Sequence, residues 1–204
     1  MRLVGSEYAE ALEACREFAA ASGALTSHAY DDPLIAAGAG TLMEEIHAAL
    51  PDLDTVVVAV GGGGLFSGVA AAAEHHGVRV VAVEPEHCRA LNAAVEAGAP
   101  VDVPVASVAA DSLGARRASA MALAAAQQAG ATSVLVPDDA IVSARQRIWE
   151  EHRLAVEHGA ATALAALLVT GDGPAGGPHG YRPEPGERVC VVLCGANTDP
   201  SDLA

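Results

Sequence analysis

The chain has 204 residues, of which 51% are hydrophobic, enough to form a buried core and to exclude an intrinsically disordered chain. Its net charge of −15 excludes nucleic acids and anionic membrane surfaces as partners, because both attract cationic proteins. The Lys+Arg total of 11 consists entirely of arginine, so the chain contains no lysine. Chemistry that needs a side-chain primary amine therefore needs one from outside these residues.

Hydrophobic patterning and capping residues predict alternating strands and helices. In chain order we expect a strand over 1–5, helices over 7–22 and 33–50, a strand over 56–60, a helix over 65–76, a strand over 79–83, helices over 86–97 and 117–129, a strand over 134–136, helices over 138–152 and 156–169, and a strand over 189–193. The Gly/Pro-rich residues 171–187 are expected to be an exposed excursion, and the last strand is expected to be central in the sheet.

The strands are continuous apolar runs, which is typical of strands buried on both faces. The sequence therefore predicts a three-layer α/β fold, with a largely parallel sheet covered by helices on both faces. The longest charge-free stretch, 55–73, is interrupted by four glycines, so we expect no membrane span. The four cysteines form no CxxC pair and no signal peptide opens the chain, which indicates a cytoplasmic protein.

Four successive glycines, Gly61 to Gly64, follow the strand over 56–60 and precede a helix. Backbone N–H groups at such a junction can bind a phosphate, because no Cβ prevents close approach. The spacing Gly62-x-Gly64-x-x-Ser67, with Glu84 twenty residues after Gly64, also approximates a dinucleotide-binding pattern. A nucleotide-dependent oxidoreductase is therefore one alternative, although a serine replaces the third glycine.

Other polar residues have simpler structural interpretations. Glu84 is more often the cap of the next helix than a ribose or metal ligand. Asp138 and Asp139 directly follow Pro137 and are interpreted as a helix cap, and His75-His76 as cations at a helix C-terminus. His28 is left without an assigned role.

Several segments, in this order, resemble the fold-type II pyridoxal-phosphate enzymes, and among them the serine/threonine dehydratases (threonine ammonia-lyases). These segments are HAYDDPLIAAGAGTLMEEI, VVVAVGGGGLFSGVA, VVAVEPE, ADSLGARR, VPDDAI and VLCGANTD. The tetraglycine followed by an apolar residue, together with the final CGxN, is the most specific part of the resemblance.

The resemblance implies pyridoxal 5'-phosphate as the cofactor and assigns a set of residues to it. The backbone of Gly61, Gly62, Gly63, Gly64 and Leu65 would bind the phosphate. Cys194 would face the pyridine nitrogen, Asn197 would help to fix the C-terminal loop, and Glu157 would lie near the ring edge. The implied reaction is elimination of water from L-serine or L-threonine, which gives a 2-oxo acid and ammonia.

The family's Schiff-base lysine, near the N-terminus in a Ser-Phe-Lys type motif, has no counterpart here, so no catalytic residue is assigned in this chain. The chain resembles the C-terminal two thirds of such an enzyme, with residues 1–28 as a remnant of the small domain and 29–204 as the cofactor-binding domain. Relatives with a structural cation pair a glutamate matching Glu84 with an aspartate where this chain has Ala90, so no metal site is expected.

These features leave three functional hypotheses. The first is a serine/threonine dehydratase-like lyase, acting on an amino acid as a homodimer or with a separately encoded N-terminal segment. The second is a noncatalytic phosphate-binding fragment or pseudoenzyme with the same fold. The third is the nucleotide-dependent oxidoreductase domain.

Overall fold

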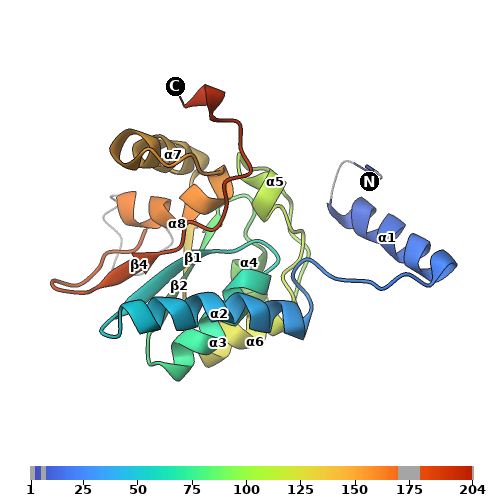
Figure 1. Cartoon of the computed structure of the whole chain (residues 1–204), viewed down its shortest axis with the longest axis horizontal. Helices are drawn as coiled ribbons and strands as arrows, with labels where there is room; N and C mark the ends of the chain where they lie inside the picture. The colour runs from blue at the N-terminus through green and yellow to red at the C-terminus, as the bar shows by residue number, and fades with distance from the viewer. Residues whose placement is uncertain (1–2, 6–7, 170–179, 204) are drawn as a thin grey trace.

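The structure is a computed structural model that describes residues 3–5, 8–169 and 180–203 (Figure 1). The elements are α1 (Tyr8–Ser22), α2 (Pro33–Ala49), β1 (Thr55–Ala59), α3 (Gly64–His75), β2 (Arg79–Pro85), α4 (Ala90–Ala97), α5 (Ala110–Leu113), α6 (Ala120–Gln128), β3 (Thr132–Val136), α7 (Asp138–His152), α8 (His158–Leu168), β4 (Val189–Val191) and the 3-10 helix η1 (Pro200–Asp202). None of the helices in these ranges is both long and apolar enough to cross a membrane.

The four strands form one parallel sheet in the order β3-β2-β1-β4. Val57 of β1 lies opposite Val81 of β2 on one side and Val191 of β4 on the other. Because the strands are parallel, the residues that follow β1 and β4 emerge at the same edge of the sheet. That carboxyl edge brings the glycine loop and residues 192–197 together.

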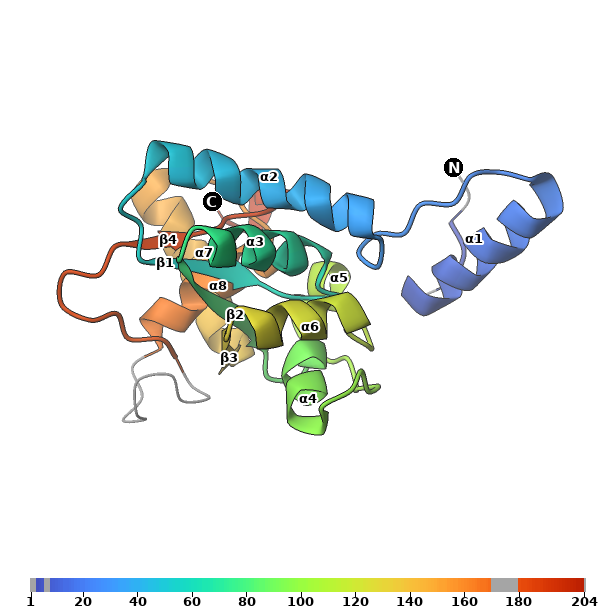
Figure 2. The same cartoon turned by 90° about the horizontal axis from the view of Figure 1, so that it is seen from below.

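Helices cover both faces of the sheet, as expected for strands that are apolar throughout (Figure 2). Val56 and Val58 point into a core formed with α2, α3, α4 and α6, whereas Val57 and Ala59 point into a second core formed with α7 and α8. The prediction of a three-layer α/β fold is therefore confirmed. Helix α1 stands apart from these layers in both views (Figures 1 and 2).

Helix boundaries follow the capping residues. Asp32 caps α2 by accepting hydrogen bonds from the backbone N–H groups of Leu34 and Ile35. Gly23 and Gly77 follow α1 and α3 with φ of +69° and +70°, which only glycine adopts easily. Two expected starts were too early: α4 begins at Ala90 instead of residue 86, and α6 at Ala120, after the cap Ser119, instead of residue 117.

The strand predictions hold for β1, β2 and β3 but fail at the two ends of the chain. Residues 3–5 form no strand, and residues 1–2 lie outside the described ranges. β4 is shorter than expected and pairs only with β1, so within the described sheet it is an edge strand and the prediction of a central position was wrong. An apolar run indicates burial but does not reveal which strands are available to pair with it.

The chain on both sides of β4 is anchored by buried polar contacts. The expected excursion over 171–187 falls mostly outside the described ranges, and its end returns to the sheet through Glu187, which accepts a hydrogen bond of 2.6 Å from the hydroxyl of Thr55. After β4, the buried Arg145 of α7 donates hydrogen bonds to Thr198 and to both carboxylate oxygens of Asp202. The Arg145 contacts fix residues 198–202 against α7.

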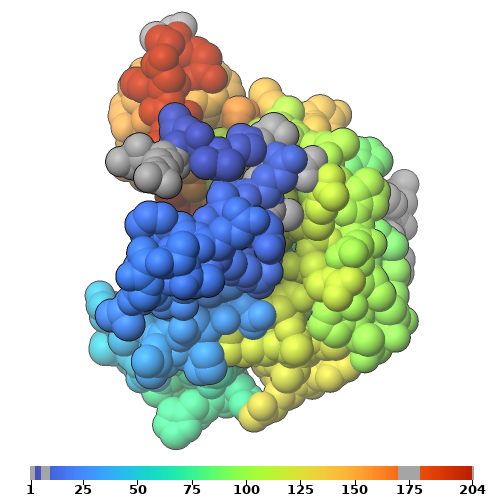
Figure 3. All heavy atoms as spheres, turned by 90° about the vertical axis from the view of Figure 1, so that its right-hand side faces the viewer, coloured from blue at the N-terminus to red at the C-terminus, as the bar shows by residue number. Residues whose placement is uncertain are grey.

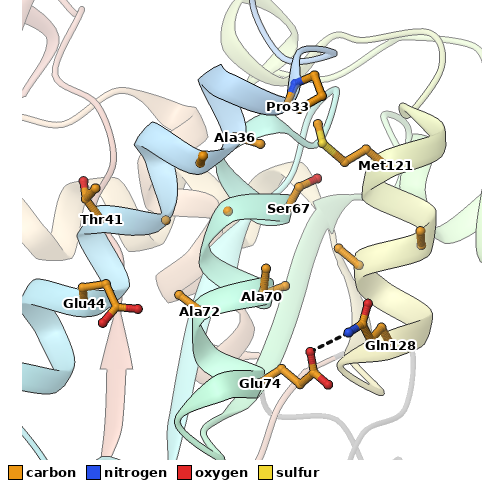
Figure 4. Close-up of a pocket in the computed structure, with 16 residues that line it drawn as sticks. Pro33, Ala36, Thr41, Glu44, Ser67, Ala70, Ala72, Glu74, Met121 and Gln128 are labelled. Atoms are coloured by element: carbon orange, nitrogen blue, oxygen red, sulfur yellow. Dashed lines mark hydrogen bonds between the residues drawn. The ribbon is translucent and has the colours of Figure 1, made fainter.

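Helices α2 and α3 approach closely because Gly40 faces Gly68: a Cβ at Gly40 would lie 3.0 Å from the Gly68 carbonyl oxygen. A groove of about 500 Å³ remains between α2, α3 and α6, and most of its wall is alanine and glycine (Figure 4). Glu74 and Gln128 close one end of this groove through a 2.9 Å hydrogen bond. The groove lies along the helices, and the four loop glycines are not among the residues that line it.

Candidate phosphate-binding site

The glycine loop presents a series of unpaired backbone N–H groups. Within the described part of the chain, no acceptor is found for the N–H groups of residues 61–66, which comprise the loop and the first turn of α3. The first N–H groups of a helix always lack partners inside the helix, and they carry the positive end of its dipole. The loop can therefore bind a phosphate without losing any hydrogen bond of the fold.

Two carbonyl groups of the same loop accept hydrogen bonds, and these bonds fix the conformation of the loop. The Gly62 carbonyl accepts a hydrogen bond of 3.1 Å from the N–H of Ser119, and the Gly63 carbonyl accepts one of 2.6 Å from the hydroxyl of Ser67. Ser67 occupies the position of the third glycine in the dinucleotide pattern. The hydrogen bond from its hydroxyl holds the loop in place. From the sequence, Ser67 was treated only as a departure from the glycine pattern, and this structural role was not predicted.

Three of the four glycines are required for reasons that the structure shows. Gly63 has φ of +97°, and a Cβ there would also overlap the methyl group of Ala122. A Cβ at Gly62 would overlap the ring of Tyr30, and one at Gly64 would lie 2.7 Å from the Tyr30 Cα. Tyr30, which the sequence did not single out, therefore lies directly against the loop.

A cavity of about 1150 Å³ opens beside the loop. Leu12, Ala29, Tyr30 and Gly62 line one part of it, and a second wall is formed by residues 102–105, 110–112 and 114–117. In the space-filling view the blue N-terminal residues and the yellow-green residues that include this second wall lie next to each other (Figure 3). The wall carries Arg116 and Arg117, and Arg117 forms an ion pair of 2.7 Å with Asp102.

Cys194 and Glu157 lie together at the same edge of the sheet. The Glu157 carboxylate packs against Gly195, where a Cβ would overlap it, and the Glu157 N–H donates a 3.2 Å hydrogen bond to the Gly195 carbonyl. Although Cys194 is exposed as a residue, desolvation of its thiol and the charge of Glu157 raise its pKa, so it stays a protonated thiol at neutral pH. Asn197 is exposed, and its predicted role stays a prediction.

Glu84 is the cap of α4 and is not available to a ribose. It is completely buried, and its two carboxylate oxygens accept hydrogen bonds of 2.7 Å from the N–H groups of Leu91 and Asn92. Burial raises the pKa of Glu84 to about 8, and the two N–H groups and Arg89 oppose that rise. The feature that suggested dinucleotide binding is therefore a helix cap.

The remaining polar residues have structural contacts. Asp138 lies in the first turn of α7, not at its cap, and it accepts hydrogen bonds from the hydroxyl of Ser107 and the N–H of Val108. The ring of His76 stacks on His47 and contacts Glu44 at 2.9 Å. Across residues 3–5, 8–169 and 180–203, no group of three or more His, Cys, Asp or Glu side chains is placed to hold a metal ion.

A glycine loop with free N–H groups at the carboxyl edge of a parallel sheet is typical of α/β proteins that bind phosphate-bearing ligands. The family model described as pyridoxal-phosphate dependent enzyme matches residues 1–195. The chain therefore belongs to the pyridoxal-phosphate dependent enzyme family.

Individual relatives agree with this assignment. The chain is 34% identical over 204 residues to L-threonine ammonia-lyase of Geobacter sulfurreducens, covering 99% of this chain and 48% of the relative. It is 36% identical over 171 residues to the serine dehydratase-like protein of Mus musculus, covering 82% and 52%. The chain spans about half the length of the curated relatives it matches.

Solved structures show the same fold. The processed form of threonine deaminase isoform 2 from Solanum lycopersicum matches with a TM-score of 0.83 and 26% identity, over 99% of this chain and 54% of that one. Maize serine racemase matches with a TM-score of 0.84 and 26% identity, over 98% and 60%. These structures support the prediction of a fold-type II architecture.

The residues fit the cofactor in part. The unpaired N–H groups of residues 61–66 suit its phosphate, and the protonated Cys194 thiol suits a hydrogen bond to a heteroaromatic nitrogen. The aldehyde has no partner in this chain, because the 204 residues include no lysine. These residues offer groups that suit the phosphate and the ring nitrogen, and the 204 residues include no side-chain amine that suits the aldehyde.

Proposed function

We propose that this chain is the cofactor-holding part of a serine/threonine dehydratase-like lyase. The reaction would remove water from L-serine or L-threonine and give a 2-oxo acid and ammonia. The observation that carries the proposal is the series of unpaired N–H groups at residues 61–66, in a family whose members are pyridoxal-phosphate dependent. The names of the ammonia-lyase and dehydratase relatives support the substrate class.

Each group at the carboxyl edge then has a task. The N–H groups of Gly61, Gly62, Gly63, Gly64 and Leu65 hold the phosphate end. Cys194 would form one hydrogen bond with the pyridine nitrogen, and Glu157, at the start of α8, supports the adjoining Gly195. Asn197 helps to keep the following loop beside the cofactor.

When bound, the cofactor supplies an electron sink for the bonds at the substrate's α-carbon. A thiol at the pyridine nitrogen stabilises positive charge there less than a carboxylate would. These 204 residues supply no side-chain amine for that chemistry, because they include no lysine and arginine cannot act as a nucleophilic amine near neutral pH.

The domain division proposed from the sequence places residues 1–28 with a small domain and 29–204 with the cofactor-binding domain. The position of α1, apart from the sheet and its covering helices, supports this division. A separately encoded lysine-bearing segment would complete the enzyme, whereas a homodimer would add a second copy of the site but no lysine.

Binding measurements test the proposal directly. Calorimetric titration of the purified chain is expected to show binding of pyridoxal 5'-phosphate but not of pyridoxal, because the phosphate provides the main contact. Borohydride treatment of the complex is expected to leave no pyridoxyl group on a side chain. Binding of NAD in place of pyridoxal 5'-phosphate would overturn the proposal in favour of the oxidoreductase alternative.

A glycine variant locates the binding. Gly63→Ala is expected to weaken pyridoxal 5'-phosphate binding at least about tenfold, because strain at positive φ and the overlap with Ala122 displace the loop. The matched control is Gly98→Ala, which has φ of +69° at the end of α4 and open space around it. It carries the same kind of strain and is expected to leave binding unchanged.

A noncatalytic phosphate-binding role is the second candidate, and the observation that favours it is the absence of lysine. Assays for 2-oxo acid release from serine and threonine distinguish the two roles. They require the chain together with any lysine-bearing segment that its genome encodes next to it. Cofactor binding without turnover in that combination would favour the noncatalytic role.

A further inference from the structure

Tyr30 packs against the side of the glycine loop toward which side chains at Gly62 and Gly64 would point. The ring of Tyr30 occupies the space into which a Cβ of Gly62 would project. At Gly64 the position of a Cβ is blocked by the Cα and carbonyl oxygen of Tyr30, at 2.7 and 3.0 Å, and by the Tyr30 Cβ at 2.9 Å. Two of the four glycines are therefore required by the approach of Tyr30.

His28 holds Tyr30 in this position. The Nδ1 atom of His28 accepts hydrogen bonds from the N–H groups of Tyr30 and Asp31, at 3.2 and 2.9 Å. The His28 ring also meets the Tyr30 ring edge-on, with centroids 4.7 Å apart. Asp32 then caps α2, so the turn over residues 28–32 is fixed at both ends.

In dinucleotide-binding loops the second glycine of GxGxxG has no side chain so that the backbone can approach a pyrophosphate. Gly64 has that place in this sequence, and the Tyr30 main chain already fills the space beside it. The N–H groups of residues 61–66 nevertheless stay without acceptors, and the large cavity lies beside Gly62 and Tyr30.

We propose that Tyr30 is a specificity-determining residue that makes this loop a site for a phosphate monoester and excludes an internal diphosphate. His28 is a positioning residue that acts through Tyr30. A terminal phosphate needs access to the N–H groups from one direction only, whereas a diphosphate bridging two nucleosides must extend across the loop. The inference rests on the proposed function, because both concern ligands of the same loop.

The geometry can be tested without a ligand by a double-mutant cycle. Gly62→Ala is expected to destabilise the wild-type chain, because its methyl group meets the Tyr30 ring, and to be tolerated once Tyr30→Ala has removed that ring. Gly64→Ala is the matched control, since its methyl group meets Tyr30 main-chain atoms and stays destabilising in both backgrounds. Urea midpoints give the four comparisons, and equal costs of Gly62→Ala in both backgrounds would overturn the placement of the ring.

Selectivity is measured as the ratio of the dissociation constants of NAD and pyridoxal 5'-phosphate, with NAD added in competition. We expect the wild-type chain to prefer pyridoxal 5'-phosphate by about 100-fold or more, and Tyr30→Ala to reduce the preference about tenfold. Tyr30→Phe keeps the ring and is expected to keep the preference. Circular dichroism confirms that each variant is folded before the ratio is compared.

His28 has its own pair of variants. His28→Ala is expected to reduce the preference as Tyr30→Ala does, whereas His28→Asn restores it, because an asparagine oxygen can accept the same N–H groups in a turn. If the wild-type chain binds neither ligand, the proposed function fails. If it binds pyridoxal 5'-phosphate but Tyr30→Ala and His28→Ala leave the ratio unchanged, only the inference about Tyr30 is overturned.

Discussion

The two edges of the sheet differ in how their polar groups are satisfied. At the amino edge, Glu187 is nearly completely buried and accepts hydrogen bonds from Thr55, Tyr181 and the N–H of Glu184, with Arg79 at 3.0 Å. At the carboxyl edge, the N–H groups of residues 61–66 have no acceptor within the described chain. The amino edge is a closed network, and the carboxyl edge is open to a ligand.

This difference separates stability from binding. A saturated network loses stability when any member is removed, because its buried partners are then left without hydrogen bonds. An unsaturated edge contributes little to stability, and its free N–H groups provide binding energy instead. Substitutions at the two edges should therefore change different quantities.

The largest effect is expected for Glu187→Ala, at about 3 kcal/mol of unfolding free energy, because Thr55 and Tyr181 lose a buried acceptor and Arg79 its counter-ion. The control is Glu184→Ala, an exposed carboxylate on the same segment, expected within about 0.5 kcal/mol of wild type. Urea denaturation measures both. A change in pyridoxal 5'-phosphate affinity of folded Glu187→Ala would contradict the separation of the two edges.

Glu187 should also make the free energy of unfolding decrease at acidic pH. Burial alone would raise the pKa of Glu187, but the hydrogen bonds from Thr55, Tyr181 and Glu184 and the charge of Arg79 lower it to about 2. The stabilisation is therefore present above the ordinary value of 4.5 and is lost as the pH falls through about 2. The stability advantage of wild type over Glu187→Gln should disappear between pH 4.5 and 2.

Glu84 should show the opposite pH dependence. Its folded pKa of about 8 lies above the ordinary 4.5, so its contribution is fully present below pH 4.5 and is lost as the pH rises through 8. From pH 5 to pH 9, Glu84→Gln should gain stability relative to wild type by about 4 kcal/mol. Urea midpoints of both proteins at the two pH values measure this, and a constant difference would contradict a raised pKa.

The smallest effect is expected for Cys194→Ser. Cys194 is exposed, so the free energy of unfolding should change by less than about 0.5 kcal/mol. A hydroxyl can still form a hydrogen bond with a pyridine nitrogen, so pyridoxal 5'-phosphate affinity should change by less than about threefold. Cys194→Val cannot form that bond and should bind more weakly. Equal affinities for the two variants would argue against the proposed role of Cys194.

Local patterns were sufficient for most of the fold and for part of the site. Apolar runs located β1, β2 and β3, and Asp32, Gly23 and Gly77 marked helix ends. Glycines between a strand and a helix indicated a phosphate loop, because the free N–H groups of a helix start follow from local geometry. The absence of lysine needed only the composition.

The rest depended on contacts between residues far apart in the chain. Glu84 has the spacing of a ribose-binding acid, but only its burial against α4 shows that it is a cap. The last strand is as apolar as the others, yet its edge position depends on which strands lie beside it. Tyr30 lies 32 residues before Gly62, and no periodicity connects them.

The sequence alone therefore determined the class of fold, the location of the glycine loop and the lack of a side-chain amine. The first two follow from residue types at short spacing, and the third follows from the composition. The tertiary structure alone decided which loop N–H groups lack acceptors and which side chain covers Gly62, because burial and hydrogen-bond pairing arise only when separate elements pack together. The proposed selectivity of the loop belongs to this second group.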